Sequence, residues 1–308
     1  MQVYMLTPLI NADRLANNLN IPLLYIKRED LHPFGSHKGR SIPLMIEKYA
    51  SEGWKNFVIS SSGNAALAAA LFIKEYNTKN PQNKLYLKIY TGYKIDKEKF
   101  ARLLQITYLP LNQKIKNFFL QIKPEIKIRQ TLNPKQSAFL AEKNSKTKNL
   151  RQSIDDTALL GYEQLAKELS QLPNLSAVFI PTSSGTTAQG LYLGFEKSNL
   201  KPEIYIIQTP VCHPFVQNDL IETNSLAKAI VDKTARRKKE IANVLIQSGG
   251  EGLIVTDQEL VSAEKIYKTF YPEDKISYNS LLSLAGLIQK LNAGKKFSGP
   301  VVCLFTGR

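Results

Sequence analysis

Apolar runs with the spacing of buried strands alternate with segments of helical apolar spacing along most of this sequence. Strands are predicted at 23–27, 56–60, 84–90, 106–111, 176–181, 203–208, 252–256 and 299–307. Helices are predicted at 40–52, 64–76, 95–105, 112–122, 155–169, from 186, after 256 and at 279–292. Thr256 and Glu259 have the spacing of a capping box at the start of one of these helices. Alternation of this kind builds mostly parallel, twisted sheets flanked by helices, so we predict an α/β fold.

Length and composition narrow the class of protein further. The 308 residues exceed the usual size of a single core, and 43% of them are hydrophobic, so one large domain or two joined domains are expected. No apolar stretch approaches the roughly 20 residues that cross a bilayer, and the first residues lack the features of a secretory signal, so we expect a cytoplasmic protein. Cys212 and Cys303 lie far apart and the histidines are scattered, which argues against a disulfide framework and a metal site.

The charge balance raises the question of a polyanionic partner. Lys and Arg number 41 against 26 Asp and Glu, which gives a net charge of +15. Only the run TARRKKE at 234–240 is densely basic, and it lies in a helical pattern without the interleaved aromatic residues of a nucleic-acid stacking surface. We therefore favour basic residues spread over solvated helix faces, which would attract anionic small substrates, over a nucleic-acid interface.

Three junctions between a strand and a helix carry small polar residues. In sheets of this kind, ligands bind beyond the carboxyl ends of the strands. The stretch VISSSGNAALAAA at 58–70 has serines, a glycine and Asn64 at a helix start, where free amides suit a carboxylate. The stretch FIPTSSGTTAQG at 179–190 would suit a phosphate, although it is not a P-loop. The final strand delivers Thr306 at its carboxyl end. Each junction alone could also be an ordinary capped turn, and for the final strand a polar cap is the commoner explanation.

Lys38 lies among glycines, a serine and a histidine in EDLHPFGSHKGR at 29–40, where a helix begins. A lysine, an anion cradle and polar groups at other strand ends are what a pyridoxal phosphate site needs. The cofactor requires a lysine for its Schiff base, a phosphate cradle, and partners for its ring nitrogen and phenolic oxygen. These pieces together predict that cofactor.

Several motifs occur in the order of a known family. KRED…GSHKGR, SSSGNAA, LLGYEQLAKEL, PTSSGTTAQGL, GGEGLIVTDQELVSA and VVCLFTG resemble the fold-type II pyridoxal phosphate enzymes over nearly the whole chain. That group includes threonine synthase, the serine and threonine dehydratases, cysteine synthase and the tryptophan synthase β subunit. The second half of the chain is most similar to threonine synthases, whereas the lysine region is equally similar to tryptophan synthase β. The resemblance implies a large cofactor-binding domain of residues 1–39 and 151–308, a small substrate-binding domain of residues 40–150, and a cofactor in the cleft between them.

The resemblance also implies roles for particular residues. Lys38 would bind the cofactor covalently and then act as the base that removes the α-proton of the substrate. The cofactor-binding residues that it implies are Lys38, His37, Asn64, Ser183, Ser184, Gly185, Thr186, Thr187 and Thr306. The residues that it implies for the substrate carboxylate are Ser61, Ser62, Gly63, Asn64 and Ala65. Asn64 would bind the phenolic oxygen, the loop 183–187 the phosphate, and Thr306 the ring nitrogen. For His37, a contact with the phosphate and a purely structural role are both open.

Three segments depart from the family pattern. The phosphate loop contains a single glycine, Gly39 stands where the family has an acidic residue, and the segment ISYNSLLSLAG at 276–286 differs from the usual sequence near the substrate.

The reaction implied most directly is that of a threonine synthase, which converts O-phosphohomoserine to threonine and phosphate. A serine or threonine dehydratase and a cysteine synthase-like replacement enzyme are the alternatives. A non-catalytic relative that binds a protein or nucleic acid is a hypothesis of another class. The resemblance also suggests an amino-acid substrate and a homodimer.

Overall fold

A computed structural model describes residues 5–61, 63–93, 95, 97–107, 124–216 and 224–307. The chain forms two compact units, which are considered separately below. The first unit contains residues 1–40 and 158–308, and the second contains residues 41–157. Among the described residues, no helix is both long enough and apolar enough to span a membrane.

The first unit is built on a six-stranded sheet with the order β1-β2-β10-β7-β8-β9. Its strands are β1 (Leu9–Asn11), β2 (Leu24–Arg28), β7 (Ala177–Pro181), β8 (Glu203–Gln208), β9 (Gly252–Ile254) and β10 (Val301–Phe305). Every pairing in this sheet is parallel except that between β1 and β2. The mostly parallel α/β architecture predicted from the alternating pattern is therefore confirmed.

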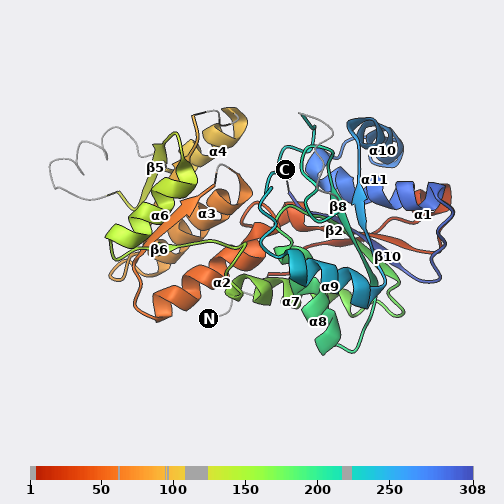
Figure 1. Cartoon of the computed structure of the whole chain (residues 1–308), viewed down its shortest axis with the longest axis horizontal. Coiled ribbons are helices and arrows are strands. Elements are labelled where there is room, and N and C mark those ends of the chain that lie inside the picture. The colour runs from red at the N-terminus through yellow and green to blue at the C-terminus, as the bar shows by residue number, and fades with distance from the viewer. Residues whose placement is uncertain are drawn as a thin grey trace. The chain divides into compact units, whose positions relative to one another are not determined.

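Helices cover both faces of this sheet (Figure 1). They are α1 (Asp13–Asn18), α7 (Thr157–Leu169), α8 (Thr186–Lys197), α9 (Lys238–Ser248), α10 (Asp257–Phe270) and α11 (Tyr278–Asn292). Successive side chains of a strand point to opposite faces. Phe179 of β7 therefore packs with α1, α10 and α11, whereas its neighbours Val178 and Ile180 pack with α7, α8 and α9. A strand that is apolar at every position is thus explained by burial on two faces.

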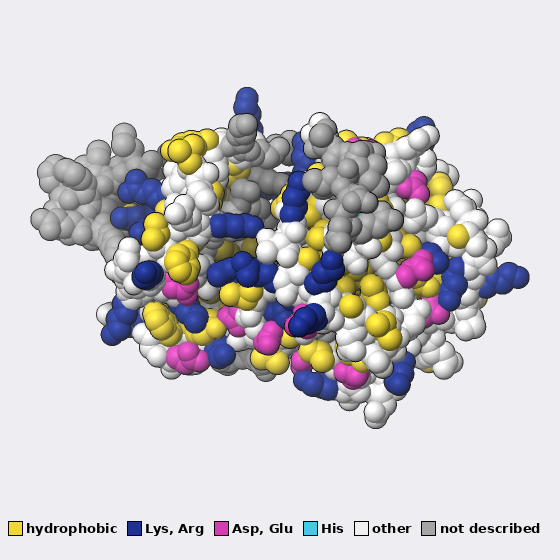
Figure 2. Space-filling model, viewed as in Figure 1, with side chains coloured by type: hydrophobic (Ala, Val, Ile, Leu, Met, Phe, Trp, Pro, Cys, Tyr) yellow, Lys and Arg dark blue, Asp and Glu magenta, His cyan; other side chains and the backbone are white. Residues whose placement is uncertain are grey.

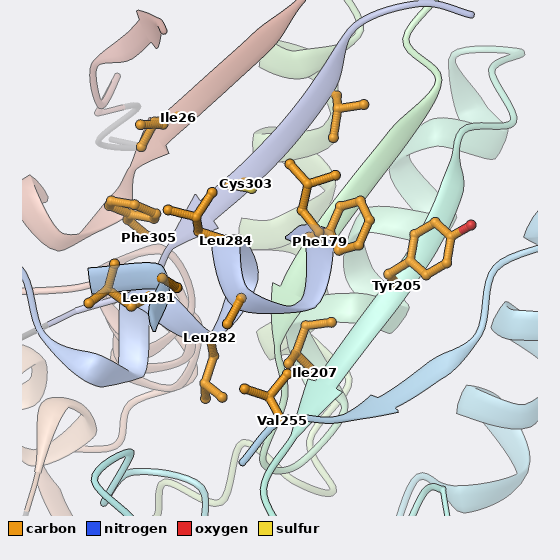
Figure 3. Packing of buried hydrophobic residues seen from close by; sticks show 14 of the residues in the cluster. Ile26, Phe179, Tyr205, Ile207, Val255, Leu281, Leu282, Leu284, Cys303 and Phe305 are labelled. Carbon is orange, nitrogen blue, oxygen red and sulfur yellow. The ribbon is translucent and has the colours of Figure 1, made fainter. Parts of the chain in front are cut away.

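Each face of the six-stranded sheet has its own hydrophobic core, and the larger core lies on the face that α11 covers. Figure 3 shows Leu281, Leu282 and Leu284 of α11 close to side chains of the sheet. Phe179 stacks on Tyr205 of the neighbouring strand with 4.5 Å between ring centroids. This packing holds the carboxyl ends of β10 and β7 in place, and those are the ends that precede the predicted site.

The second unit has a four-stranded, parallel sheet with the order β5-β4-β3-β6. Its strands are β3 (Asn56–Ser60), β4 (Tyr86–Thr91), β5 (Ile126–Gln130) and β6 (Lys148–Asn149). Its helices are α3 (Asn64–Lys79), α4 (Lys97–Thr107) and α6 (Pro134–Asn144). The helix α2 (Lys38–Ser51) begins in the first unit and continues into the second. The helix that follows β3 is α3, and it starts at Asn64, as predicted.

Most predicted elements are confirmed, and the errors have local causes. The predicted strand 106–111 is wrong for residues 106–107, which form the end of α4. The rest of that predicted strand lies outside the described residues, and so does the predicted helix 112–122. The strand β5 and the helix α6 were not predicted, although Pro134 directly after the capping residue Asn133 is a start signal for α6. The helical pattern assigned to 234–240 holds only from Lys238.

The capping box is confirmed in full. The side-chain oxygen of Thr256 accepts a hydrogen bond from the backbone N–H of Glu259, and the carboxylate of Glu259 accepts one from the N–H of Thr256. This reciprocal pair ends the loop after β9 and starts α10, as its spacing predicted.

Candidate functional site

Lys38 is the first residue of α2 and follows a tight turn. After β2, a short 3₁₀ helix (Glu29–Leu31) leads to Gly35, whose φ of 84° lies in the left-handed region that glycine tolerates. The hydroxyl of Ser36 accepts a hydrogen bond from the backbone N–H of Lys38 at 3.2 Å. Burial lowers the pKa of Lys38 to about 8, and the carboxylate of Asp232 opposes that shift. A neutral fraction of this amine is therefore present near neutral pH.

The end of β10 is fastened to the lysine turn. The carbonyl oxygen of Thr306 accepts the backbone N–H of His37 at 3.0 Å and lies 2.6 Å from His37 Nδ1. Burial lowers the pKa of His37 well below its ordinary value, and the nearby charge of Lys38 adds to this shift. His37 is therefore neutral at physiological pH. The structure therefore brings Thr306, His37 and Lys38 close together, and their roles toward the cofactor stay predictions.

Ser280 was not recognised from the sequence. Its hydroxyl donates to the carbonyl oxygen of Gly307 at 3.0 Å and accepts from the N–H of Gly307 at 3.2 Å. Ser277 donates to the same carbonyl oxygen. Both serines belong to the segment 276–286, whose departure from the family pattern was the available signal. They anchor the residue that follows Thr306.

The loop 183–187 lies between β7 and α8. Gly185 is the N-cap of α8 with a φ of 81°, and as a glycine it supplies no side-chain cap to this helix. A Cβ atom at Gly185 would lie 2.7 Å from Cγ1 of Ile241, so this position requires glycine for two reasons. The hydroxyls of Ser184 and Thr186 lie 3.0 Å apart. Uncapped amides at a helix start form a cradle for an anion.

Ser183 connects this loop to an acidic residue. Its hydroxyl accepts the backbone N–H groups of Val231 and Asp232, each at 3.1 Å. This contact brings Asp232 to the site, where its carboxylate acts on Lys38. Sequence reasoning missed Asp232, because its segment has no periodic pattern and the contact joins residues 49 positions apart.

The predicted carboxylate-binding residues lie in the second unit. Ser61 follows β3, and its hydroxyl accepts the N–H of Gly63 at 3.2 Å. Gly63 is the N-cap of α3 and, as a glycine, supplies no side-chain cap either. Asn64 and Ala65 are the first two residues of α3. Ser62 lies outside the described residues.

Two buried polar atoms lie at the ends of the strands on either side of β3. Thr91 is the last residue of β4 and Asn149 the last of β6. Within the described chain, neither Oγ1 of Thr91 nor Oδ1 of Asn149 has a hydrogen-bond partner. Buried polar atoms are nearly always paired, so these two mark the carboxyl edge of this sheet as a place for a polar ligand. The sequence carried no signal for either residue.

The first unit offers what the phosphate-bearing cofactor requires. It has a half-buried amine with a lowered pKa at Lys38, a glycine-capped helix start at the loop 183–187, and the buried Thr306 directly after the intervening strand. In the sheet, β10 lies between β2, which precedes Lys38, and β7, which precedes the loop. The residues present therefore fit pyridoxal phosphate.

Comparisons with known proteins agree with this geometry. The pattern of the family described as "Pyridoxal-phosphate dependent enzyme" matches residues 2–79 and 129–307. The threonine synthase of Halalkalibacterium halodurans is 24% identical over 314 residues, which cover 98% of this chain and 81% of that protein. The threonine synthase of Methanosarcina acetivorans is 36% identical over 66 residues, or 21% of this chain and 16% of that protein.

Two solved structures have a similar fold. A fungal L-serine ammonia-lyase from Rhizomucor miehei superposes with a TM-score of 0.76 at 16% identity, covering 98% of this chain and 93% of that one. The O-acetylserine-dependent cystathionine β-synthase of Helicobacter pylori gives a TM-score of 0.76 at 17% identity, covering 100% and 96%. At such identities the likeness concerns the fold. Fold, site and family pattern agree, and the chain belongs to the pyridoxal-phosphate dependent enzymes of fold type II, with pyridoxal 5′-phosphate as its cofactor.

Proposed function

We propose that this enzyme carries out elimination or replacement on an amino-acid substrate, with Lys38 as the lysine that binds the cofactor. The observation that carries the proposal is the half-buried amine of Lys38, whose pKa is lowered to about 8 and which follows the turn fastened to Thr306. A lysine in such surroundings can act as a nucleophile and as a base near neutral pH.

Each group of the first unit has a role in this proposal. Pyridoxal phosphate, when bound, supplies the electron sink that lets the α-proton of the substrate leave. The amine of Lys38 takes that proton, and the carboxylate of Asp232 stabilises the resulting ammonium. The loop 183–187 holds the phosphate, while the neutral His37 orients the lysine turn through its bond to the Thr306 carbonyl.

Thr306 bears on the kind of reaction. Its hydroxyl, unlike a carboxylate, does not stabilise a positive charge on the ring nitrogen of the cofactor. A weaker electron sink favours reactions in which a leaving group departs from Cβ or Cγ, and it disfavours transamination. Elimination and replacement therefore suit Thr306 better.

The substrate carboxylate is assigned in this proposal to the start of α3. Ser61, Gly63 and the first amides of the helix, at Asn64 and Ala65, form the proposed anion site at a helix start whose N-cap is a glycine. Asn64 is also the proposed partner of the phenolic oxygen of the cofactor. Ser62 is retained in the proposed set from the sequence motif alone.

A threonine synthase-like reaction, from O-phosphohomoserine to threonine and phosphate, is the preferred form. Its support is the set of threonine synthase relatives that align over 98% of this chain, together with a net charge of +15 that attracts a phosphorylated substrate. A serine or threonine dehydratase is the second candidate, supported by the fold likeness to an L-serine ammonia-lyase. Release of phosphate from O-phosphohomoserine favours the first, and release of ammonia from serine or threonine favours the second.

The experiment that tests the role of Lys38 is a visible absorption spectrum before and after borohydride. We expect a yellow band in the natural protein that borohydride abolishes, with the added mass on the peptide that contains Lys38. The Lys38→Ala variant should lack the band. Lys197→Ala, at an exposed lysine of the first unit, is the matched control and should keep it. A natural protein that stays colourless with added pyridoxal phosphate would overturn the proposal and favour a non-catalytic relative.

A further inference from the structure

A cluster of buried charges lies beside the lysine turn and has no part in the chemistry above. It consists of Lys27 at β2, Glu29 in the 3₁₀ helix, Arg40 in the first turn of α2 and Glu168 in α7. These four side chains are at most 6% exposed. The hydroxyl of Thr7 completes the cluster. Two positive and two negative side chains make it neutral.

Arg40 is the centre of the cluster. Its Nε donates to Oε2 of Glu29 at 2.9 Å and its Nη2 to Oε1 of Glu29 at 2.7 Å, which is a two-pronged pairing. Its Nη1 donates to Oε1 of Glu168. Lys27 donates to Oε2 of Glu168 at 2.5 Å and to the carbonyl oxygen of Thr7 at 2.7 Å. All four carboxylate oxygens therefore accept at least one hydrogen bond.

The charges in this cluster persist on folding. Burial alone would raise the pKa of Glu29, but the charge and hydrogen bonds of Arg40, aided by the Thr7 hydroxyl, hold it below its ordinary value. Burial alone would lower the pKa of Arg40, and Glu29 and Glu168 together raise it. Both partners therefore remain ionised at neutral pH.

Stability is a poor explanation for such a cluster. Removing charges from water costs roughly what their attraction returns, and well-packed apolar residues often stabilise a fold as well or better. The fork of Arg40 instead imposes direction, because a guanidinium must meet both carboxylates in defined planes. Arg40 stands two residues after Lys38, so its fixed direction also fixes the helical turn that carries the amine.

We propose that Glu29, Arg40 and Glu168 are positioning residues for Lys38, which hold the first turn of α2 in the orientation that presents the amine to the cofactor aldehyde. This inference rests on the proposed role of Lys38. In this proposal the three residues act on Lys38 through the backbone of α2 and not by binding the cofactor or the substrate. Thr7 supports them through its hydroxyl, which donates to Glu29 and accepts from Arg40 at 3.2 Å.

The test compares two equal substitutions on α7. Glu168→Gln removes one charge from the buried cluster, whereas Glu163→Gln removes one from a pair with the largely exposed Lys197. The cofactor-free full chain is mixed with pyridoxal phosphate, and the rate of attachment at Lys38 is followed by absorbance at a temperature below the unfolding transition of every variant. We expect Glu168→Gln to slow attachment by about tenfold and Glu163→Gln by less than about twofold.

The outcome separates positioning from simple stabilisation. A merely structural cluster would lower the melting temperature of Glu168→Gln while leaving the rate per folded molecule unchanged, and that result would overturn the inference. If Glu168→Gln does not fold, Thr7→Val takes its place, since it removes only a hydroxyl from the cluster, and an unchanged rate there has the same meaning. If pyridoxal phosphate does not attach to the natural protein, the proposed function fails. That result is distinct from a failure of this inference, because it is seen without any variant.

Discussion

At the scale of single residues, the protonation of Lys38 is set by two influences of opposite sign. Burial favours the neutral amine, and the carboxylate of Asp232 favours the charged one. Because the neutral amine is the nucleophile, we expect attachment of pyridoxal phosphate to accelerate as the pH rises through about 8 and then to level off.

The Asp232→Asn variant isolates one of these influences. Without the carboxylate the charged amine loses its stabilisation, so the midpoint of the rate profile should move to lower pH by up to about one unit. To check this shift, the rate of the absorbance change is measured for both proteins from about pH 6 to about pH 10, in steps of about half a pH unit. A midpoint that stays in place or rises would rule out Asp232 as a partner of Lys38.

The structure explains why a glycine stands at position 39, where the family pattern has an acidic residue. A Cβ atom at this position would lie 2.2 Å from Nδ1 of His32, because the imidazole packs directly against the glycine. We expect Gly39→Ala to lower the free energy of unfolding by about 2 kcal/mol, as overpacking does. In a His32→Ala background the same change should cost much less. Urea unfolding of the natural protein, the two single variants and the double variant measures the coupling between Gly39→Ala and His32→Ala. Additive changes in the free energy of unfolding would contradict this explanation.

At the scale of elements, the start of α8 depends on Gly185 for both space and backbone conformation. Gly249, at the end of α9, is a matched control, because its φ of 71° is also left-handed but nothing lies within 4 Å of the Cβ it would acquire. Alanine at either position should cost about 1 kcal/mol of backbone strain. Gly185→Ala should in addition displace Ile241 and weaken retention of pyridoxal phosphate by about tenfold. Equilibrium dialysis compares the two variants, and equal retention would remove the loop 183–187 from the cofactor site.

At the scale of the whole molecule, the chain carries a net charge of +15. On the face drawn in Figure 2, Lys and Arg side chains are scattered among hydrophobic and acidic ones across the described surface. Such a field attracts small anions from a distance and is screened by salt. We expect attachment of pyridoxal phosphate to slow severalfold between about 0.02 and 0.5 M NaCl. Pyridoxal, which lacks the phosphate, should respond little, and an equal response of both compounds would exclude this electrostatic attraction.

The sequence alone was sufficient for the features that depend on neighbouring residues. Strand and helix periodicity predicted the mostly parallel α/β architecture, and the strand 56–60 and the helix start at Asn64 were located to the residue. The capping box at Thr256 was equally readable, since its hydrogen bonds span three residues. Lys38, the loop 183–187 and Thr306 were recognisable because small polar residues at the carboxyl ends of buried strands form a local pattern. Their chemical roles stay predictions.

Other features exist only once distant segments meet. His37 contacts Thr306 across 269 positions, and Glu168 reaches Arg40 across 128. No periodicity or short motif encodes such pairings, because they follow from which strands become neighbours in the sheet. The neighbours of Lys38, the space that requires Gly39 and the closed cluster around Arg40 were therefore set by folding, since burial and Coulomb forces depend on distances in space and not on separation along the chain.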